Sequence, residues 1–225
     1  MAVAIGILGK HPDFGDFLHS GLSDESSSGL SIWLDKTLSE LRDSQGEEWP
    51  RFWDAANLLR FWIGRAVLGR SLAGILVPSH DRVGRRYPLV LAVEGARLPM
   101  PTIDPNQAFW TALEEHLARQ RSDATRGAVG LIDGLDLNLS ADGVPEDNGD
   151  VLWAHRPDGD LEALLRAASR EDPSRAATGR SYWWSPGNDT HAATWLGCNG
   201  LPKSDALGWI LAGVAVTEGE PNAVR

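Results

Sequence analysis

Short runs of apolar residues, each bounded by glycine, proline or charged residues, predict the buried strands of a sheet. They cover residues 2–8, 72–77 and 87–93, and a further apolar run at 59–63 fits either a strand or the end of a helix. Runs of this length and composition are typical of strands with two buried faces. The turn-forming segment 78–86 separates two of them, which is compatible with an antiparallel pair.

A helical repeat of apolar positions follows the first run. Spacings of three and four residues predict an amphipathic helix over residues 30–42. Its apolar face consists of Leu30, Trp33, Leu34, Thr37, Leu38 and Leu41. A second helix is predicted from Pro50, and a third from Asp104, with Asp104 as its N-cap and Pro105 at its first position.

The C-terminal half has a weaker pattern. Residues 129–139 fit a strand or a loop, and helices are predicted at 160–169 and 202–211. Two late strands are predicted at 182–184 and 194–198.

Strands and helices mix along the chain without strict alternation. The fold class expected is therefore α+β: a single domain with a largely antiparallel mixed sheet covered by several helices. The strands at 2–8, 72–77 and 89–93 should share this sheet, with the helix at 30–42 packed on it. We expect the domain to span residues 1–216, and residues 217–225 to form a flexible tail.

Composition and charge restrict the function classes. The chain has 225 residues and a formal net charge of −10. This charge argues against a nucleic-acid partner or an anionic membrane surface, because both require basic patches. The single cysteine, Cys198, excludes an internal disulfide and favours a reducing compartment. No apolar run approaches the roughly 20 residues of a spanning helix, so we expect a cytoplasmic protein without direct membrane insertion.

One segment has part of a phosphate-binding loop. Gly6, Gly9 and Lys10 follow a predicted strand. However, Ala4 stands in place of the first glycine, and His11 replaces the hydroxyl residue that would hold magnesium. The motif is therefore incomplete, and nucleotide binding is not predicted.

Ser79, His80 and Asp81 have the residue types of a catalytic triad. Adjacent side chains in an extended segment alternate in direction, whereas a triad is a spatial relay of nucleophile, base and orienting carboxylate. A polar loop is the favoured interpretation.

The histidines show no metal-binding pair at helical spacing. His11 and His19 lie near Asp13 and Asp16, which would suit a small metal site. Turn capping by the two aspartates is the favoured interpretation. The residues thus predict no catalytic group, no metal and no cofactor.

Arg82, Arg85 and Arg86 form one compact basic cluster. It suits an acidic partner or a phosphorylated segment. It also suits internal pairing with Asp81 and the acidic stretch 146–150. The sequence leaves both interpretations open.

Three stretches together resemble a known family. The first contains Gly6, Gly9, Lys10, Pro12, Gly15, Asp16 and Phe17. The second contains Gly74, Pro78, Ser79, Asp81, Gly84, Arg85, Pro88 and Leu89. The third contains Ser181, Trp183, Trp184, Gly200, Leu201 and Pro202. Their order and spacing over residues 4–212 resemble the TagF/ImpM family of bacterial type VI secretion systems. His11 and His80 depart from the family pattern, which argues against a shared catalytic role for them.

The resemblance implies a non-enzymatic accessory protein that needs no cofactor. It would act as a post-translational negative regulator of type VI secretion by binding the system's forkhead-associated scaffold protein. A small hydrolase or phosphate-handling enzyme, and a structural subunit of the secretion assembly, are the alternatives. The interaction candidates are Gly9, Lys10, Pro12, Gly15, Asp16, Phe17, Pro78, Ser79, Asp81, Arg82, Gly84, Arg85, Arg86, Trp183 and Trp184.

The two signature loops, 9–17 and 78–86, would meet at one end of the sheet if the first strand neighbours the strand at 72–77. In that arrangement we expect Asp81 and Arg85 to hold the loop together. Arg82 and Arg86 are expected to point outward and contact the partner.

Overall fold

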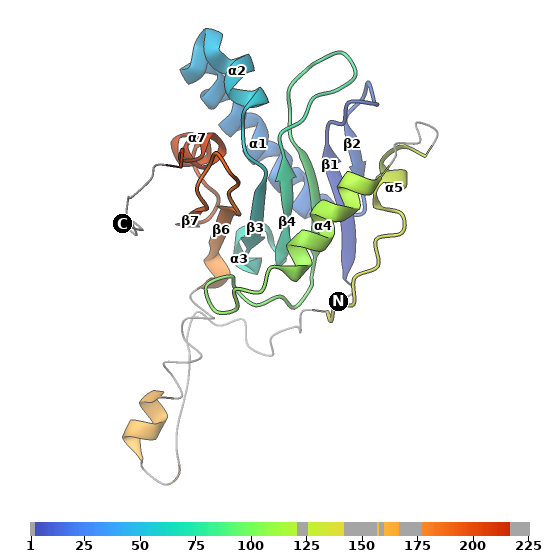
Figure 1. Ribbon diagram of the computed structural model, residues 1–225. Helices are drawn as coiled ribbons and strands as arrows, with labels where there is room; N and C mark the ends of the chain where they lie inside the picture. Colours follow the sequence, from blue (N-terminus) through green and yellow to red (C-terminus); the bar gives the residue numbers. More distant parts are fainter. Residues whose placement is uncertain (1–2, 121–125, 142–156, 158–159, 167–176, 217–225) are drawn as a thin grey trace.

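The computed structural model describes residues 3–120, 126–141, 157, 160–166 and 177–216. Within these residues, seven strands form one sheet in the order β2-β1-β5-β4-β3-β6-β7 (Figure 1). The strands are β1 (Ala4–Gly9), β2 (Leu18–Ser20), β3 (Leu59–Ile63), β4 (Leu72–Val77), β5 (Leu89–Glu94), β6 (Arg180–Ser185) and β7 (Thr194–Asn199). Every neighbouring pair is antiparallel. The α+β class and the common sheet for the three predicted strands are confirmed.

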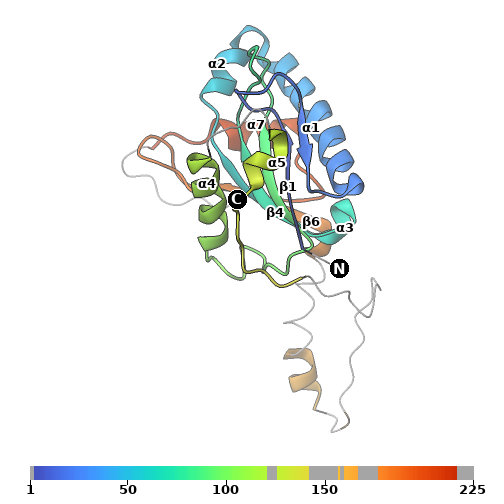
Figure 2. The same cartoon turned by 90° about the vertical axis from the view of Figure 1, so that its right-hand side faces the viewer.

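One face of the sheet is covered by α1 (Asp24–Gln45) and α7 (Ser204–Ala212), as Figure 2 shows from the side. The predicted apolar stripe of α1 faces the sheet, and Trp33 packs against Trp183 at a ring distance of 5.1 Å. The helix begins earlier than predicted, because the Ser23 hydroxyl accepts the backbone N–H of Ser26 and caps it. The predicted covering helix is therefore confirmed, with an earlier start.

The opposite face carries α4 (Ala108–Arg119) and α5 (Gly127–Ile132). Trp110 and Leu113 of α4 pack on Ile75 and Leu91 of the sheet. The expected helix start at Asp104 and Pro105 is wrong, since the Asp104 carboxylate accepts the N–H of Asn106 in a turn and the helix begins at Ala108.

Short elements connect these layers. They are the 3-10 helix η1 (Gly46–Glu48), α2 (Trp49–Asp54), α3 (Arg65–Leu68) and the 3-10 helix η2 (Ala177–Gly179). The expected strand or loop at 129–139 is wrong for its first residues, which belong to α5, where Leu131 is buried against β1 and β5.

Some sequence predictions extend past the described residues. Of the predicted helix 160–169, residues 161–166 are helical. The expected tail at 217–225 lies outside the described residues. The ambiguous run 59–63 is β3, and all five of its side chains are buried, including Arg60.

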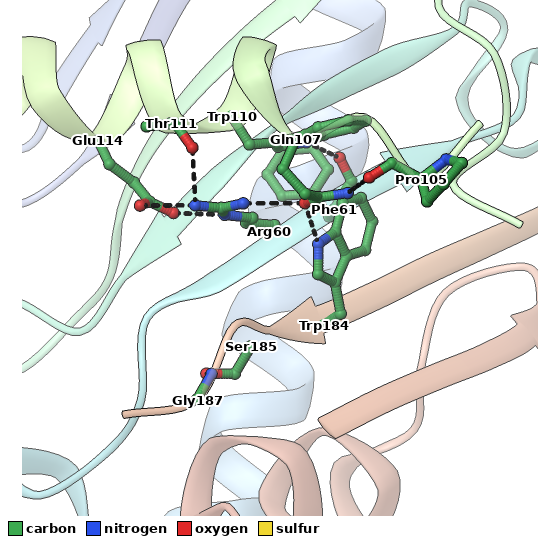
Figure 3. A network of polar contacts seen from close by, with 10 residues as sticks. All are labelled: Arg60, Phe61, Pro105, Gln107, Trp110, Thr111, Glu114, Trp184, Ser185 and Gly187. Carbon is green, nitrogen blue, oxygen red and sulfur yellow. Dashed lines mark hydrogen bonds and ion pairs between the residues drawn. The ribbon is translucent and has the colours of Figure 1, made fainter. Parts of the chain in front are cut away.

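Arg60 is a charged residue on a central strand, and a polar network makes its burial possible (Figure 3). Its guanidinium donates from Nε and Nη2 to the two carboxylate oxygens of Glu114, at 2.6 and 2.9 Å. Nη2 also donates to Thr111 Oγ1, and Nη1 donates to Gln107 Oε1. Gln107 Oε1 accepts a further bond from Trp184 Nε1. The network therefore joins α4 to strands β3 and β6.

Candidate interaction surface

Two loops meet at one end of the sheet, and we call residues 10–17 and 78–88 the paired loops. Figures 1 and 2 show them on the same side of the molecule. Gly9 ends β1 opposite Leu89, which begins β5 and also pairs with Val77 at the end of β4. The strand β1 thus neighbours β5, not the predicted strand at 72–77. The loops still meet, because β5 starts where the second loop ends.

Backbone hydrogen bonds join the two loops directly. The N–H of Lys10 donates to the carbonyl of Pro88 at 3.2 Å, and the N–H of Arg82 donates to the carbonyl of Phe14 at 2.8 Å. The Arg85 guanidinium adds a third connection, from Nη2 to the carbonyl of Gly15 at 2.8 Å. The two loops therefore form one unit.

Asp81 is the centre of this unit, with 0% of its side chain exposed. Oδ1 accepts the backbone N–H groups of Val83 and Arg85 at 3.1 and 2.8 Å. Oδ2 accepts Arg85 Nε at 2.5 Å and lies 3.1 Å from Lys10 Nζ. Burial raises the pKa of Asp81, but the bonds from Arg85 and Lys10 outweigh it and hold this pKa well below its ordinary value. The carboxylate is therefore charged and fully bonded.

Two glycines allow this geometry. The N–H of Gly84 donates to the carbonyl of Asp81 in a tight turn, and the φ of +85° at Gly84 is a backbone conformation that glycine adopts without steric cost. Gly9 also has a positive φ, and a Cβ at this position would clash with the carbonyl oxygen of Pro88. The signature glycines thus have a structural reason to be present.

The three arginines of the basic cluster have different surroundings. Arg85 holds the loop through Asp81, as expected. Arg86 does not point freely outward, because Nε and Nη2 donate to the two oxygens of Asp54 at 2.9 and 2.7 Å. Arg82 is exposed and lies close to Gly15, and it forms no ion pair within the described part of the chain. Arg82 is thus the member of the cluster that is available to a partner.

Apolar side chains are exposed on both of the paired loops. Val83 is 70% exposed and Phe17 is 44% exposed. The Phe17 ring meets the Tyr87 ring edge-on at 5.4 Å, and the Tyr87 hydroxyl donates to Asp35 of α1 at 3.0 Å. Burial and this bond raise the pKa of Tyr87. We call Phe17, Arg82, Val83 and the exposed part of Arg85 the loop surface.

Other sequence candidates lie elsewhere. Trp183 and Trp184 are buried on opposite faces of β6, where Trp183 packs on Phe61 and Trp184 bonds Gln107. They belong to the core and lie away from the loop surface. Pro12 and Asp16 are exposed on the first loop. The expectation that Asp16 caps a turn finds no support in the hydrogen bonds of the described residues.

The side chains of Ser79, His80 and Asp81 are not arranged as a catalytic triad. His80 Nδ1 bonds the backbone carbonyl of Asp81 at 2.9 Å, while the carboxylate of Asp81 is occupied by Arg85 and Lys10. Lys10 is thus engaged with a carboxylate, and the chain after it forms a loop and β2 where a phosphate-binding motif has a helix. Among the residues described, no three His, Cys, Asp or Glu side chains gather as metal ligands would.

Sequence reasoning missed the partner of Arg86. Asp54 lies 32 positions earlier at the end of α2. It also missed Trp53, whose Nε1 donates to the carbonyl of Ser79 at 2.8 Å and joins α2 to the second loop. Neither contact has a local signal, because each depends on how α2 packs against the sheet.

The site and the fold together define an α+β protein with an exposed pair of loops joined by hydrogen bonds and without an assembled catalytic relay in its described residues. Residues 6–129 match the profile of the TagF N-terminal domain, described as type VI secretion system-associated. Since this match covers more than half of the chain, the chain belongs to the TagF N-terminal domain family. None of its described helices is long and apolar enough to cross a membrane.

A solved structure has the same fold. The crystal structure of PA0076 from Pseudomonas aeruginosa PAO1 matches with a TM-score of 0.71 and 24% sequence identity. The match covers 98% of this chain and 97% of that chain. No protein of curated function matches the sequence significantly.

Proposed function

We propose that this protein is a cytoplasmic, non-enzymatic accessory protein of the type VI secretion system that restrains the system after translation. In this proposal it binds the forkhead-associated scaffold protein through the loop surface. Membership of the type VI secretion-associated family supports the general role. The observation that carries the binding proposal is Asp81, a buried carboxylate whose four bonds hold the exposed loops in one shape.

A rigid loop pair is suited to binding. Ordering flexible side chains and loops at an interface costs binding free energy, so a surface that is already ordered loses less when a partner docks. Here the two loops are joined by backbone hydrogen bonds and by Arg85, and the first loop exposes the ring of Phe17. Arginine and aromatic residues are also the types that most often dominate interface energies.

The charge of Arg82 restricts the partner. The protein carries a net charge of −10, yet Arg82 stands exposed without an ion pair among the described residues. A partner surface with a carboxylate or phosphate near an apolar patch would satisfy Arg82, Val83 and Phe17 together. We therefore expect the contact region of the scaffold to be acidic and partly apolar.

Binding of purified scaffold protein, measured by calorimetry, tests this proposal. Arg82→Ala should weaken binding at least about 30-fold, the effect of an interface anchor of about 2 kcal/mol. The matched control is Arg119→Ala, which removes an exposed arginine of α4 whose ion pair, within the described residues, is with Glu115 of the same helix. This control should bind as the unchanged protein does, and both variants should melt at its temperature. Equal affinity for Arg82→Ala and the unchanged protein would refute the loop surface as the binding site.

The regulatory part of the proposal is tested by measuring type VI secretion in cells. Overproduction of the unchanged protein or of Arg119→Ala should reduce type VI secretion, whereas overproduction of Arg82→Ala should not. A rise in secretion on overproduction, or loss of assembly when the protein is absent, would instead favour a structural subunit.

A further inference from the structure

The two edge strands of the sheet, β2 and β7, differ in how well they are protected (Figure 1). β2 has three residues, and its Leu18 packs against Leu131 of α5. β7 has six residues, with no charge and no proline among them, and it pairs with β6 without a bulge. Proteins use short strands, charges, prolines and bulges to prevent an edge strand from pairing with another chain. β7 has none of these features.

Every second residue of β7 directs its backbone away from the sheet. The carbonyl of Arg180 in β6 accepts the N–H of Gly64, so Arg180 faces β3. Its partner Asn199 in β7 is therefore not bonded to it and faces outward, because bonding directions alternate along antiparallel strands. Gly197 and Trp195, two and four positions earlier, face the same way. Within the described residues, no loop or helix bonds these outward N–H and C=O groups.

The side chains of the outward residues lie beside an aromatic pair. The Trp195 ring is 47% exposed and stacks on Tyr182 at 5.8 Å. Gly197 leaves room for this stack, because a Cβ at Gly197 would come within 2.8 Å of the Trp195 ring. Arg180 lies over the Tyr182 ring, and its Nη1 donates to Asn199 Oδ1 at 3.0 Å. The free edge thus carries an exposed indole at one end and an amide held by a cation at the other.

A second copy of β7 that runs antiparallel complements this edge. With a two-fold axis at Gly197, Gly197 pairs with Gly197 of the second copy, and Trp195 pairs with Asn199 of the second copy. Each outward N–H of one copy then meets an outward carbonyl of the other. The edge is therefore complementary to itself, as a two-fold interface requires.

Charge permits this pairing. Arg180 is the only charged residue in β6 and β7, so the net charge of −10 is carried elsewhere on the chain. No two charges would face each other across the axis within β7. Because Arg180 neighbours Asn199, it would approach the Trp195 ring of the second copy, and a cation beside an indole is attracted to it.

The second copy is also the occupant that this edge favours. Another protein would need an unprotected edge of its own, which proteins generally avoid, whereas every copy of this chain carries the same one. We infer that β7 is a homodimerisation edge through which two copies form one continuous sheet. β3 and β6 separate β7 from β4, which leads into the second of the paired loops, so this pairing leaves the loop surface uncovered. The inference does not depend on the proposed function.

Analytical ultracentrifugation of the whole protein, over about a hundredfold range of concentration, tests the association. We expect a monomer–dimer equilibrium without larger species, because the pairing occupies β7 of both copies. A monomer at every concentration, or an open series of larger species, would overturn the inference.

Amide hydrogen exchange followed by NMR locates the contact. The amides of Trp195, Gly197 and Asn199 should exchange more slowly at high protein concentration. Those of Leu196 and Cys198 face β6 and should not respond to concentration. A dimer without this alternation has its interface elsewhere and contradicts the assignment. If the chain stays monomeric and purified scaffold protein alone protects the outward amides, the edge pairs with another protein and the second copy is the wrong occupant.

Two substitutions at Asn199 separate the backbone from the side chain. Asn199→Pro removes an outward N–H, and an edge strand tolerates proline where its N–H faces solvent. By symmetry the dimer loses two hydrogen bonds, so its dissociation constant should rise about 30-fold. Asn199→Ala keeps the N–H and also loses the bond from Arg180, so it is the matched control and should change the constant by less than about threefold. An unchanged dimer in a folded Asn199→Pro protein refutes the pairing.

Two tryptophans with equal exposure provide a second pair of variants, which decides the matter if Asn199→Pro fails to fold. Trp195 and Trp209 are both 47% exposed, and Trp209 lies on α7. A lysine on an edge strand prevents pairing with another strand. Trp195→Lys should therefore abolish the dimer, and Trp209→Lys should keep it, with melting temperatures confirming that both are folded. The opposite result would place the interface on α7 and overturn the inference.

Discussion

The buried Arg60–Glu114 pair provides the sharpest test of the energetics of this fold. The Arg60 side chain is 7% exposed, and that of Glu114 is 25% exposed. Breaking a buried ion pair is costly because the remaining charge is left uncompensated, by about 3–5 kcal/mol. The two single substitutions should therefore differ, because the two partners differ in their access to water.

Glu114→Leu should be the more damaging of the two. Among the described residues, it leaves the buried guanidinium with Gln107 and Thr111 as its acceptors. We expect a loss of about 3 kcal/mol in the free energy of unfolding. At about 2–4 °C per kcal/mol for a chain of this size, the melting temperature should fall by about 6–12 °C.

Arg60→Met should cost less. Glu114 can turn towards water, and Gln107 keeps its bond from Trp184. The unbranched methionine fills much of the space of the arginine stem. We expect about 1–2 kcal/mol. The double variant Arg60→Met with Glu114→Leu should be more stable than Glu114→Leu alone, since it contains no unpaired charge.

Differential scanning calorimetry and urea unfolding followed by tryptophan fluorescence measure these changes. Glu115→Leu is the control, because Glu115 forms an exposed pair with Arg119 on the same helix and should change stability by less than about 1 kcal/mol. The reasoning is refuted if Glu114→Leu melts as Glu115→Leu does, or if the double variant is less stable than Glu114→Leu alone.

Three further predictions concern the paired loops and the proposed non-enzymatic role. The folded-state pKa of Asp81 lies below its unfolded value, so the stability from this carboxylate is present above about pH 4 and is lost as the pH falls below that value. The gap in melting temperature between the unchanged protein and Asp81→Asn should thus be wide at pH 7 and narrow below pH 4, and a constant gap would contradict this. Gly84→Ala should lower the free energy of unfolding in urea by about 1–2 kcal/mol because its φ is +85°, whereas Gly179→Ala, with open space and no positive φ, should change it by less than about 0.5 kcal/mol. His19→Ala should leave scaffold affinity and type VI secretion within about twofold of the unchanged protein, and its loss of activity while folded would return an enzyme to consideration.

Periodic burial is the part of this fold that the sequence predicts well. The stripe from Leu30 to Leu41 repeats at helical spacing because one side of α1 faces the sheet along its whole length. The apolar runs of β4 and β5 are continuous because both of their faces are covered. In both cases the apolar positions in the sequence are the positions that the fold buries.

Both distant contacts and local turns explain where the sequence predictions were ambiguous or wrong. The sequence left the run at 59–63 ambiguous, and its assignment as a central strand depends on acceptors for Arg60 that α4 supplies more than 40 positions later. Residues 129–132 lack a strong helical stripe because α5 is short and buries mainly Leu131. The start of α4 shifted because Asp104 forms a local turn of its own.

The same distinction applies to the site. Asp81 and Arg85 are four residues apart, and their pairing could be expected from the turn between them. The pairing of Arg86 with Asp54 could not, because it depends on α2 reaching the end of the sheet. Residue type alone placed both arginines in one basic cluster, although one closes a loop and the other joins two elements.

Two contacts join α2 to the second loop. Trp53 bonds the carbonyl of Ser79, and Asp54 bonds Arg86 on the other side of Asp81. The loop surface begins at Arg82, one residue beyond Asp81. A partner that docks on the loop surface would therefore meet a loop that is already held by contacts on both sides of Asp81. Because such a loop loses less freedom when a partner binds, less of the binding free energy should be lost to ordering it.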